Sequence, residues 1–206
     1  MSSPPRLLTR DELGDVLNQQ GLVGAGVEVG VFRGEFSEQV LIKWHGKKLY
    51  LVDPWAFQSD YLDSWGGSDD AMERLLHCTL NRLHRFRARI DVIRKRSDQA
   101  ALRFADAVLD FVYIDANHSF SAVANDLQLW YPKIRTGGLL AGHDYFDARA
   151  DENLEPIRGQ QPISIPPGEL TSYGVKSAVD EFVRKRELEL HTTGERLPTW
   201  YVWKTD

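Results

Sequence analysis

The sequence has little that would tie it to an oxidising compartment. Its 206 residues include one cysteine, Cys78, so no disulfide can form within the chain. Disulfides are typical of secreted proteins, and nothing here indicates that environment. Cys78 lies among Leu75, Leu76 and Leu80, and we therefore expect it to be a buried, unreactive thiol.

Long apolar runs and a surplus of positive charge are missing as well. No segment approaches the ~18 apolar residues of a membrane span, and the N-terminal MSSPPRLLTR lacks the apolar core of a signal peptide. The formal net charge is -5, whereas nucleic-acid binding usually needs a basic face. The one basic stretch, 82–96, overlaps a helix-to-strand transition and is interpreted as a solvated surface. We therefore expect a cytoplasmic, soluble protein without a membrane or nucleic-acid partner, and the sequence leaves a homo-oligomer open.

The sequence does contain an alternation of strand and helix patterns. Apolar residues recur at helical spacing in six segments, 9–20, 37–45, 69–86, 98–104, 119–134 and 173–186. Ser37 is a candidate N-cap, and Phe120, Val123, Leu127 and Trp130 are expected on one side of their helix. Short β-rich runs cover 24–31, 47–55, 89–95, 108–115, 137–145, 188–193 and 199–204.

Strands that alternate with helices and are apolar on both faces predict a parallel sheet covered on both sides. The chain, 1–206, is therefore interpreted as one doubly wound, Rossmann-like α/β domain. Its sheet should be seven-stranded and mostly parallel, with an antiparallel C-terminal strand. Two long connections, 54–68 and 146–172, leave the carboxyl ends of strands, where open α/β sheets bind ligands. They are expected to be lid or specificity loops, with disordered decoration as the alternative.

The first candidate site is the glycine turn after the first strand. In GVEVGVFRG, Gly30 and Gly34 allow sharp turns, and Glu28 stands at the strand tip. This acid would repel a pyrophosphate and attract a cation such as an amino group. Asp53, at the end of the next strand, can bind both hydroxyls of a ribose. S-adenosylmethionine is a positively charged nucleoside without phosphates, so it can bind both Glu28 and Asp53. NAD would fit Asp53 but not Glu28. The alternative is that the glycine turn is purely structural.

The second candidate site lies at the tips of two later strands. Asp115 and His118 follow the strand 108–115, and His143 and Asp144 lie in the segment 137–145. Taken alone, an Asp at a strand end is often a capping turn, and a lone histidine is often a surface residue. We infer a reaction centre because these groups should meet at neighbouring strand tips, beside a site shaped for a nucleoside.

Together these motifs resemble the class I S-adenosylmethionine-dependent methyltransferases over nearly the whole chain. The segment YIDANHSFSAVANDLQLWYPKIRTGGLLAGHDY is similar to the branch of macrocin- and mycinamicin-type O-methyltransferases, and more distantly to catechol O-methyltransferase. The resemblance implies which residues surround the cofactor. Glu28, Gly30 and Gly34 would line its methionine end, and Asp53 would hold the ribose. Ser97 and Asp98 would flank the adenine, and Asp115 would also lie beside the cofactor.

The resemblance also implies a place for a metal and a base. In metal-dependent members, an acid ends the fourth strand and two further ligands end the fifth, which corresponds to Asp115, His143 and Asp144. The general base stands three residues after the first acid, at His118. The usual fifth-strand pair is acid–acid or acid–amide, and histidine is softer than magnesium prefers. Three alternatives stay open: a manganese- or iron-like metal, a magnesium site with Asp115 and Asp144 as the direct ligands, or no metal.

The chemistry of methyl transfer explains why such groups are needed. The cofactor supplies the leaving group, and the protein positions the reactants and prepares the nucleophile. A hydroxyl must lose its proton to a base such as histidine or be acidified by a metal. We therefore predict an O-methyltransferase for a hydroxylated small molecule, such as a sugar or phenol of a natural product. An NAD-dependent oxidoreductase is disfavoured by Glu28 and the missing Gly-x-Gly-x-x-Gly, and an inactive nucleoside-binding module by Asp115, His118 and Asp144.

Overall fold

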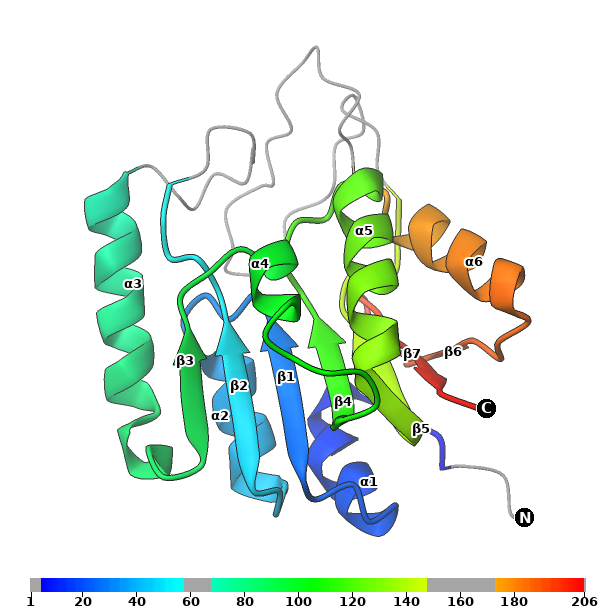
Figure 1. The fold of residues 1–206 in the computed structure, drawn as a ribbon, viewed down its shortest axis with the longest axis horizontal. Helices are drawn as coiled ribbons and strands as arrows, with labels where there is room; N and C mark the ends of the chain where they lie inside the picture. The colour runs from blue at the N-terminus through cyan, green and yellow to red at the C-terminus, as the bar shows by residue number, and fades with distance from the viewer. Residues whose placement is uncertain (1–4, 58–67, 148–172, 206) are drawn as a thin grey trace.

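The computed structural model describes residues 5–57, 68–147 and 173–205, which form a seven-stranded sheet flanked by helices (Figure 1). The strands are β1 Ala25–Val29, β2 Lys48–Val52, β3 Ile90–Ile93, β4 Leu109–Ile114, β5 Ile134–Gly142, β6 His191–Thr192 and β7 Trp200–Trp203. The α-helices are α1 Leu13–Gln19, α2 Glu35–Lys43, α3 Asp69–Arg82, α4 Ser97–Ala101, α5 Phe120–Trp130 and α6 Val175–Arg186. Short 3₁₀ helices cover Arg10–Glu12, His84–Phe86 and Tyr131–Lys133.

The order of the strands is β3-β2-β1-β4-β5-β7-β6. Strands β1 to β5 pair in parallel, and β7 pairs antiparallel with both β5 and β6. The chain runs outward from β1 to β3 and then returns to β4 on the other side of β1, so β1 and β4 flank the point where the strand order reverses. The predicted doubly wound fold with an antiparallel C-terminal edge is confirmed, and a ligand is expected at this reversal point.

Two hydrophobic layers hold the sheet between the helices. One face packs against α4, α5 and α6, and the other against α1, α2 and α3. Figure 1 shows α4 and α5 in front of the sheet and α2 behind it. All six residues of β4 are buried, as expected of a strand at the centre of a sheet covered on both sides. Val175, Val179, Phe182 and Val183 of α6 are likewise buried, as their spacing predicts.

Two local expectations are wrong, for Ser37 and for Cys78. Gly34, with φ +70°, is the N-cap of α2, and Ser37 lies inside that helix, where it is buried. In α5, Val123, Leu127 and Trp130 are buried, and Phe120, the first residue of the helix, is 42% exposed. Cys78 is exposed rather than buried, because α3 buries the face of Leu76 and Thr79.

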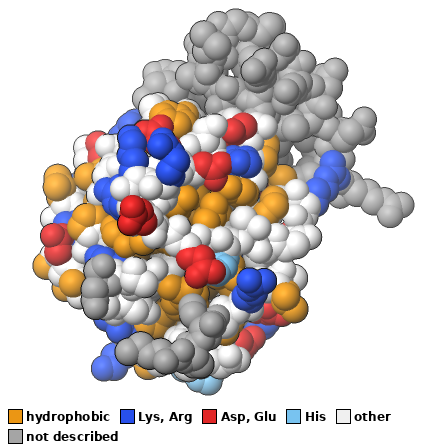
Figure 2. Space-filling view, turned by 90° about the vertical axis from the view of Figure 1, so that its right-hand side faces the viewer, with side chains coloured by type: hydrophobic (Ala, Val, Ile, Leu, Met, Phe, Trp, Pro, Cys, Tyr) orange, Lys and Arg blue, Asp and Glu red, His pale blue; other side chains and the backbone are white. Residues whose placement is uncertain are grey.

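The predicted lid loops lie largely outside the described residues. Of the two segments, 58–67 and 148–172 are not described, so the lid role and the single-domain organisation stay predictions. No helix in the described ranges has the length and apolar character to span a bilayer. On the face drawn in Figure 2, acidic and basic side chains are interspersed rather than gathered by sign.

Candidate active site

A cavity of about 430 Å³ opens at the carboxyl ends of β1, β2, β3 and β4. Its lining includes Glu28, Gly30, Asp53, Ser97, Asp98, Asp115 and His118. Most of the residues predicted from separate motifs are therefore brought together around one space. Gly34, His143 and Asp144 are not part of the lining.

The glycine turn after β1 cannot accept a side chain. Gly30 has φ +87°, and a Cβ placed there would stand 2.0 Å from the carbonyl oxygen of Asp115. The turn is fixed to its neighbours, since Gly30 N–H donates to Val52 and Asp115 N–H donates to Val29. The backbone of β1 therefore approaches that of β4 closely, which leaves room for a ligand above the turn.

Glu28 is a buried acid that lines the cavity. Its carboxylate accepts a hydrogen bond from the hydroxyl of Ser37, which explains why Ser37 is buried inside α2. Burial raises the pKa of Glu28 to about 8, the hydrogen bond from Ser37 opposes this rise, and the charge of Asp115 adds to it. Such an acid favours a cationic partner, because a positive charge would stabilise its ionised form.

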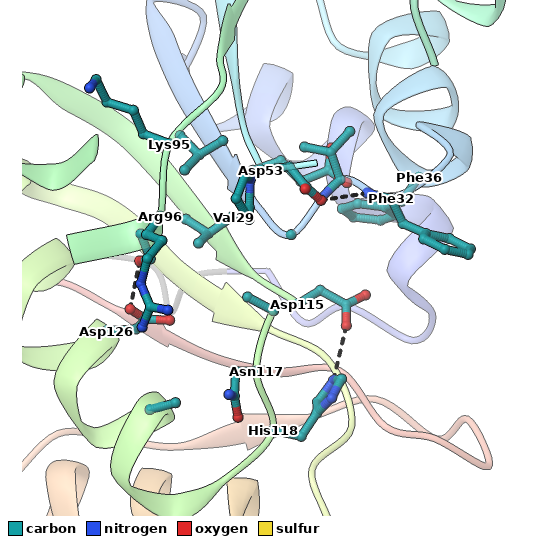
Figure 3. A pocket seen from close by; sticks show the side chains of 18 of the residues that line it. Val29, Phe32, Phe36, Asp53, Lys95, Arg96, Asp115, Asn117, His118 and Asp126 are labelled. Atoms are coloured by element: carbon teal, nitrogen blue, oxygen red, sulfur yellow. Dashed lines mark hydrogen bonds and ion pairs between the residues drawn. The ribbon is translucent and has the colours of Figure 1, made fainter. Parts of the chain in front are cut away.

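Asp53 fixes the loops that follow β1 and β2. Its Oδ2 accepts the N–H groups of Val31 and Phe32, each at 3.0 Å, and its Oδ1 accepts that of Trp55 at 2.7 Å (Figure 3). Burial raises the pKa of Asp53, and these backbone hydrogen bonds lower it. Oδ1 keeps a lone pair for a ligand in the cavity, so this carboxylate can serve both the loops and a ribose.

At the far end of the cavity, Ser97 and Asp98 open α4. The Ser97 hydroxyl donates to Asp126 at 2.6 Å and accepts a hydrogen bond from Trp130 at 2.8 Å. Asp126 lines the cavity, and burial raises its pKa to about 6. Asp126 could not be predicted as a cavity residue, because a single acid within a helical pattern usually faces solvent.

The carboxylates and histidines after β4 and β5 form a compact cluster. Nε2 of His118 lies 3.3 Å from Oδ1 of Asp115 and 3.2 Å from Oδ2 of Asp144. Nδ1 of His143 lies 2.8 Å from Oδ1 of Asp144 and 3.9 Å from Oδ2 of Asp115. Figure 3 shows the Asp115 and His118 side chains directed toward each other at the edge of the cavity. The two strand tips therefore meet as predicted.

The charges within this cluster depend on one another. Burial alone would lower the pKa of His118, but its contacts with Asp115 and Asp144 raise it to about 10. Burial also opposes the charged form of His143, and the same two carboxylates raise its pKa. Burial would raise the pKa of Asp144, but contacts with both histidines hold it well below the ordinary value. In the free protein, the two carboxylates therefore favour the protonated form of His118.

The donor set of this cluster fits a divalent cation. One ligand atom each of Asp115, His118 and Asp144 lies within 4.8 Å of the other two. Oδ1 of Asp144 is buried and has no aligned hydrogen-bond donor within the described residues. Two carboxylates and an imidazole suit manganese or iron, and the two carboxylates alone suit magnesium. In this group of three, the histidine that accompanies Asp115 and Asp144 is His118, whereas the predicted metal ligand was His143.

One further cavity residue was not expected from the sequence. Arg10 comes from the 3₁₀ segment Arg10–Glu12, and its guanidinium carbon lies 5.4 Å from the centre of the Phe36 ring. Arg10 belongs to no motif and stands next to an acid-rich helix start, so the sequence offered no signal for it.

Comparisons with known proteins identify the family of this chain. The family described as "Methyltransferase domain" matches residues 27–145, more than half of the chain. An uncharacterised protein of Acanthamoeba polyphaga mimivirus is 23% identical over 151 residues, which cover 71% of this chain. The match spans 63% of that viral protein, less than two thirds of its length.

Solved structures share the fold at low sequence identity. A Staphylococcus aureus protein assigned as a caffeoyl-CoA O-methyltransferase is 11% identical, with 97% of this chain and 85% of that chain covered and a TM-score of 0.63. A SAM-dependent methyltransferase from Aquifex aeolicus is 14% identical, with coverages of 95% and 89% and a TM-score of 0.56. An rRNA methylase from Streptococcus thermophilus is 13% identical, with coverages of 90% and 89% and a TM-score of 0.55.

Proposed function

Because the chain belongs to the methyltransferase-domain family, as a class I S-adenosylmethionine-dependent methyltransferase, we propose that it methylates a hydroxyl group of a small molecule. The acceptor would be a sugar or phenol of a natural product, as in the macrocin- and mycinamicin-type branch. The observation that carries this proposal is the cluster of Asp115, His118 and Asp144 beside the cavity that holds Glu28 and the Gly30 turn.

The cofactor would lie along the cavity from the Gly30 turn to α4. Glu28 would face the amino group of its methionine end, with the backbone at Gly30 and Gly34 alongside. Asp53 would accept the ribose hydroxyls, and Ser97 and Asp98 would flank the adenine. In support, the five residues other than Gly34 line one cavity. When bound, S-adenosylmethionine supplies an activated methyl group on its sulfonium.

The protein's own task is to orient the acceptor hydroxyl and remove its proton. His118 lines the cavity within 3.3 Å of Asp115 and 3.2 Å of Asp144. We assign His118 as the group that receives the proton, and Asp115 as the residue that orients its ring and borders the cofactor. Because both carboxylates hold a proton on His118 in the free protein, this assignment requires that part of their charge is offset during the reaction.

A divalent metal would meet that requirement. Asp115 and Asp144 would hold it, with His143 beside Asp144, and Mg²⁺ or Mn²⁺ would lower the pKa of a bound hydroxyl. The support is the donor set and the buried Oδ1 of Asp144 without an aligned hydrogen-bond donor. Chelator treatment should then abolish turnover and a divalent ion should restore it, whereas full activity in chelator would leave the cluster as a metal-free base.

The first experiment separates this proposal from an oxidoreductase. S-adenosylhomocysteine should raise the melting temperature by mass action, and NAD should not. A rise with NAD alone would refute the methyltransferase assignment.

The second experiment identifies the acceptor class. Transfer of labelled methyl from S-adenosylmethionine is measured with panels of sugars, phenols and ribosomal RNA, since one structural neighbour is an rRNA methylase. We expect labelling of hydroxylated small molecules. The basic stretch supports this choice, because its Arg82, Arg85 and Arg94 form ion pairs with glutamates. Label found in RNA but in no small molecule would overturn the choice of acceptor while leaving methyl transfer intact.

A further inference from the structure

Arg10 is a cation that lines the cavity from outside the matched family region, residues 27–145. Its backbone N–H donates to Oε2 of Glu195 at 2.9 Å. Its guanidinium carbon lies 5.4 Å from the centre of the Phe36 ring. The arginine is therefore held at its backbone and at its side chain, which limits the conformational freedom it would lose on binding a ligand.

Arg10 lies at the same end of the cavity as Glu28. The ring of Phe36 packs against that of Tyr113, with their centroids 4.1 Å apart. Tyr113 on β4 is in turn the register partner of Glu28 on β1. The positive charge over Phe36 and the buried carboxylate of Glu28 therefore flank one region, above the neighbouring strands β1 and β4.

The two cations that follow β3 lie at the opposite end of the cavity. Lys95 and Arg96 follow β3 and immediately precede Ser97. Figure 3 places Arg96 with Asp126 on one side of the cavity and Phe36 with Asp115 on the other. Two arginines lie on the other side of that division, Arg10 over the Phe36 ring and Arg33 over the Phe32 ring. Of these two, Arg10 is the one whose charge lowers the pKa of Glu28.

The surroundings of Arg10 suit an incoming anion. The side chain is half-buried and forms no ion pair with the described residues. Burial opposes its charge, while Tyr113, Asp115 and Glu195 favour it. A guanidinium presents N–H groups in a planar fork that matches both oxygens of a carboxylate. A carboxylate in the cavity would therefore give the guanidinium the direct ion pair that Asp115 and Glu195 do not form with it in the described structure.

We propose that Arg10 binds the carboxylate at the methionine end of the cofactor, opposite Glu28, which faces the amino group. An amino-acid group carries one charge of each sign, and Glu28 alone would satisfy only the positive one. This inference rests on the proposed function and deepens it, because it assumes S-adenosylmethionine as the ligand. Arg10 and Glu28 then form a pair of opposite charges that fixes the direction of the cofactor in the cavity.

The test compares two ligands that differ in one carboxylate. S-adenosylhomocysteine carries it, and the decarboxylated analogue S-adenosyl-3-thiopropylamine keeps the amino group without it. Calorimetric Kd values are measured for the wild type, Arg10→Gln, Arg10→Lys and the control Arg85→Gln. Arg85 also stacks over a phenylalanine, 4.7 Å from the centre of the Phe86 ring, but it does not line the cavity.

Wild type and Arg85→Gln should prefer S-adenosylhomocysteine by roughly tenfold or more. Arg10→Gln should lose this preference and bind the analogue as the wild type does, with Arg10→Lys in between. An undiminished preference in Arg10→Gln, or equal weakening of both ligands, would overturn the inference and leave the proposed function standing. If Arg10→Gln does not fold, Arg10→Lys decides by the same comparison. A wild type that binds neither ligand would refute the proposed function itself.

Discussion

Replacing Glu28 by glutamine should make the free protein more stable at alkaline pH and at the same time weaken its binding of the cofactor product. Glu28 is 3% exposed. Burial raises its pKa to about 8, although the hydrogen bond from Ser37 opposes the rise. Glutamine keeps nearly the same shape and can still accept that hydrogen bond, but it has no charge to bury.

The sign of the pH dependence follows from proton linkage. The folded protein holds this proton more tightly than the unfolded chain, because the folded pKa of about 8 exceeds the ordinary value of 4.5. The stabilisation is complete below the ordinary value and is lost as the pH rises through the folded pKa. One pKa unit corresponds to about 1.4 kcal/mol, so the free energy of unfolding should fall by a few kcal/mol, and at most about 5 kcal/mol, above the folded pKa.

Urea unfolding of the wild type and Glu28→Gln near pH 5, pH 7 and pH 9 measures this loss. The variant should gain on the wild type by a few kcal/mol as the pH rises. Glu187→Gln is the control, because Glu187 is exposed at the end of α6 and its replacement removes no buried charge. Parallel profiles for the wild type and Glu28→Gln would refute the reasoning.

The affinity for S-adenosylhomocysteine should move in the opposite direction. An ionised Glu28 would face the ammonium group of the ligand, and a neutral amide forms a weaker hydrogen bond with it. We expect a rise in Kd of roughly tenfold near pH 8. Higher stability combined with weaker binding would show that the buried acid of Glu28 serves ligand binding at a cost in stability. An unchanged affinity would mean that Glu28 serves the fold alone.

Three further predictions concern the same site. Gly30→Ala should lower the free energy of unfolding by several kcal/mol or prevent folding, since φ is +87° and the Cβ would stand 2.0 Å from a backbone oxygen; Gly21→Ala, with φ +67° and nothing within 4 Å, should lose about 1 kcal/mol, and equal losses in urea titrations would contradict this. Asp115→Asn and His118→Ala should lower methyl transfer by about a hundredfold or more with little change in the Kd of S-adenosylhomocysteine, and near-normal turnover in both would count against their roles. Ser37→Ala removes a hydrogen bond that lowers the pKa of Glu28, so ligand binding measured by calorimetry should need a higher pH, and an unchanged profile would exclude this coupling.

The fold could be predicted because the pattern of apolar and capping residues within short segments indicates where its strands and helices lie. Five of the six residues from Leu109 to Ile114 are apolar, which favours a strand buried on both faces, and all six residues, Asp110 included, are buried. Ser119 is the N-cap of the helix that follows, α5, and its hydroxyl accepts the N–H of Ala122. Periodicity and capping act over a few residues, so they can be read without knowing the tertiary structure.

The orientation of individual helices needed the structure. Cys78 follows an apolar spacing, but α3 buries Leu76 and Thr79. Ser37 has the chemistry of an N-cap, yet Gly34 with φ +70° starts α2 and Ser37 bonds Glu28. In both cases the decision depends on which element packs against the helix, and that contact is remote in sequence.

The candidate site was predictable in part for the same reason. Strand tips in a parallel sheet meet at one edge, so the approach of Asp115 and His118 to Asp144 follows from the fold. Which histidine stands between the two carboxylates depends on side-chain direction, and only coordinates resolve it. Arg10 and Asp126 reach the cavity from elements that carry no motif.

Backbone strain is concentrated around the cavity, and this affects how Asp53 can be tested. Of the five non-glycine residues with positive φ in the described ranges, three follow strands that end near the site, with φ of +52° at Phe32, +38° at Trp55 and +54° at Asp144. Such conformations cost on the order of 1–3 kcal/mol each. Asp53 offsets two of them, because its carboxylate accepts the N–H groups of Phe32 and Trp55.

Removing that carboxylate would release both loops as well as any ribose contact, so weaker binding by Asp53→Asn would not distinguish the two roles. The ribose contact must therefore be measured by changing the ligand: loss of the 2′-hydroxyl from S-adenosylhomocysteine leaves both loops intact, and any fall in affinity then belongs to the contact with the ribose.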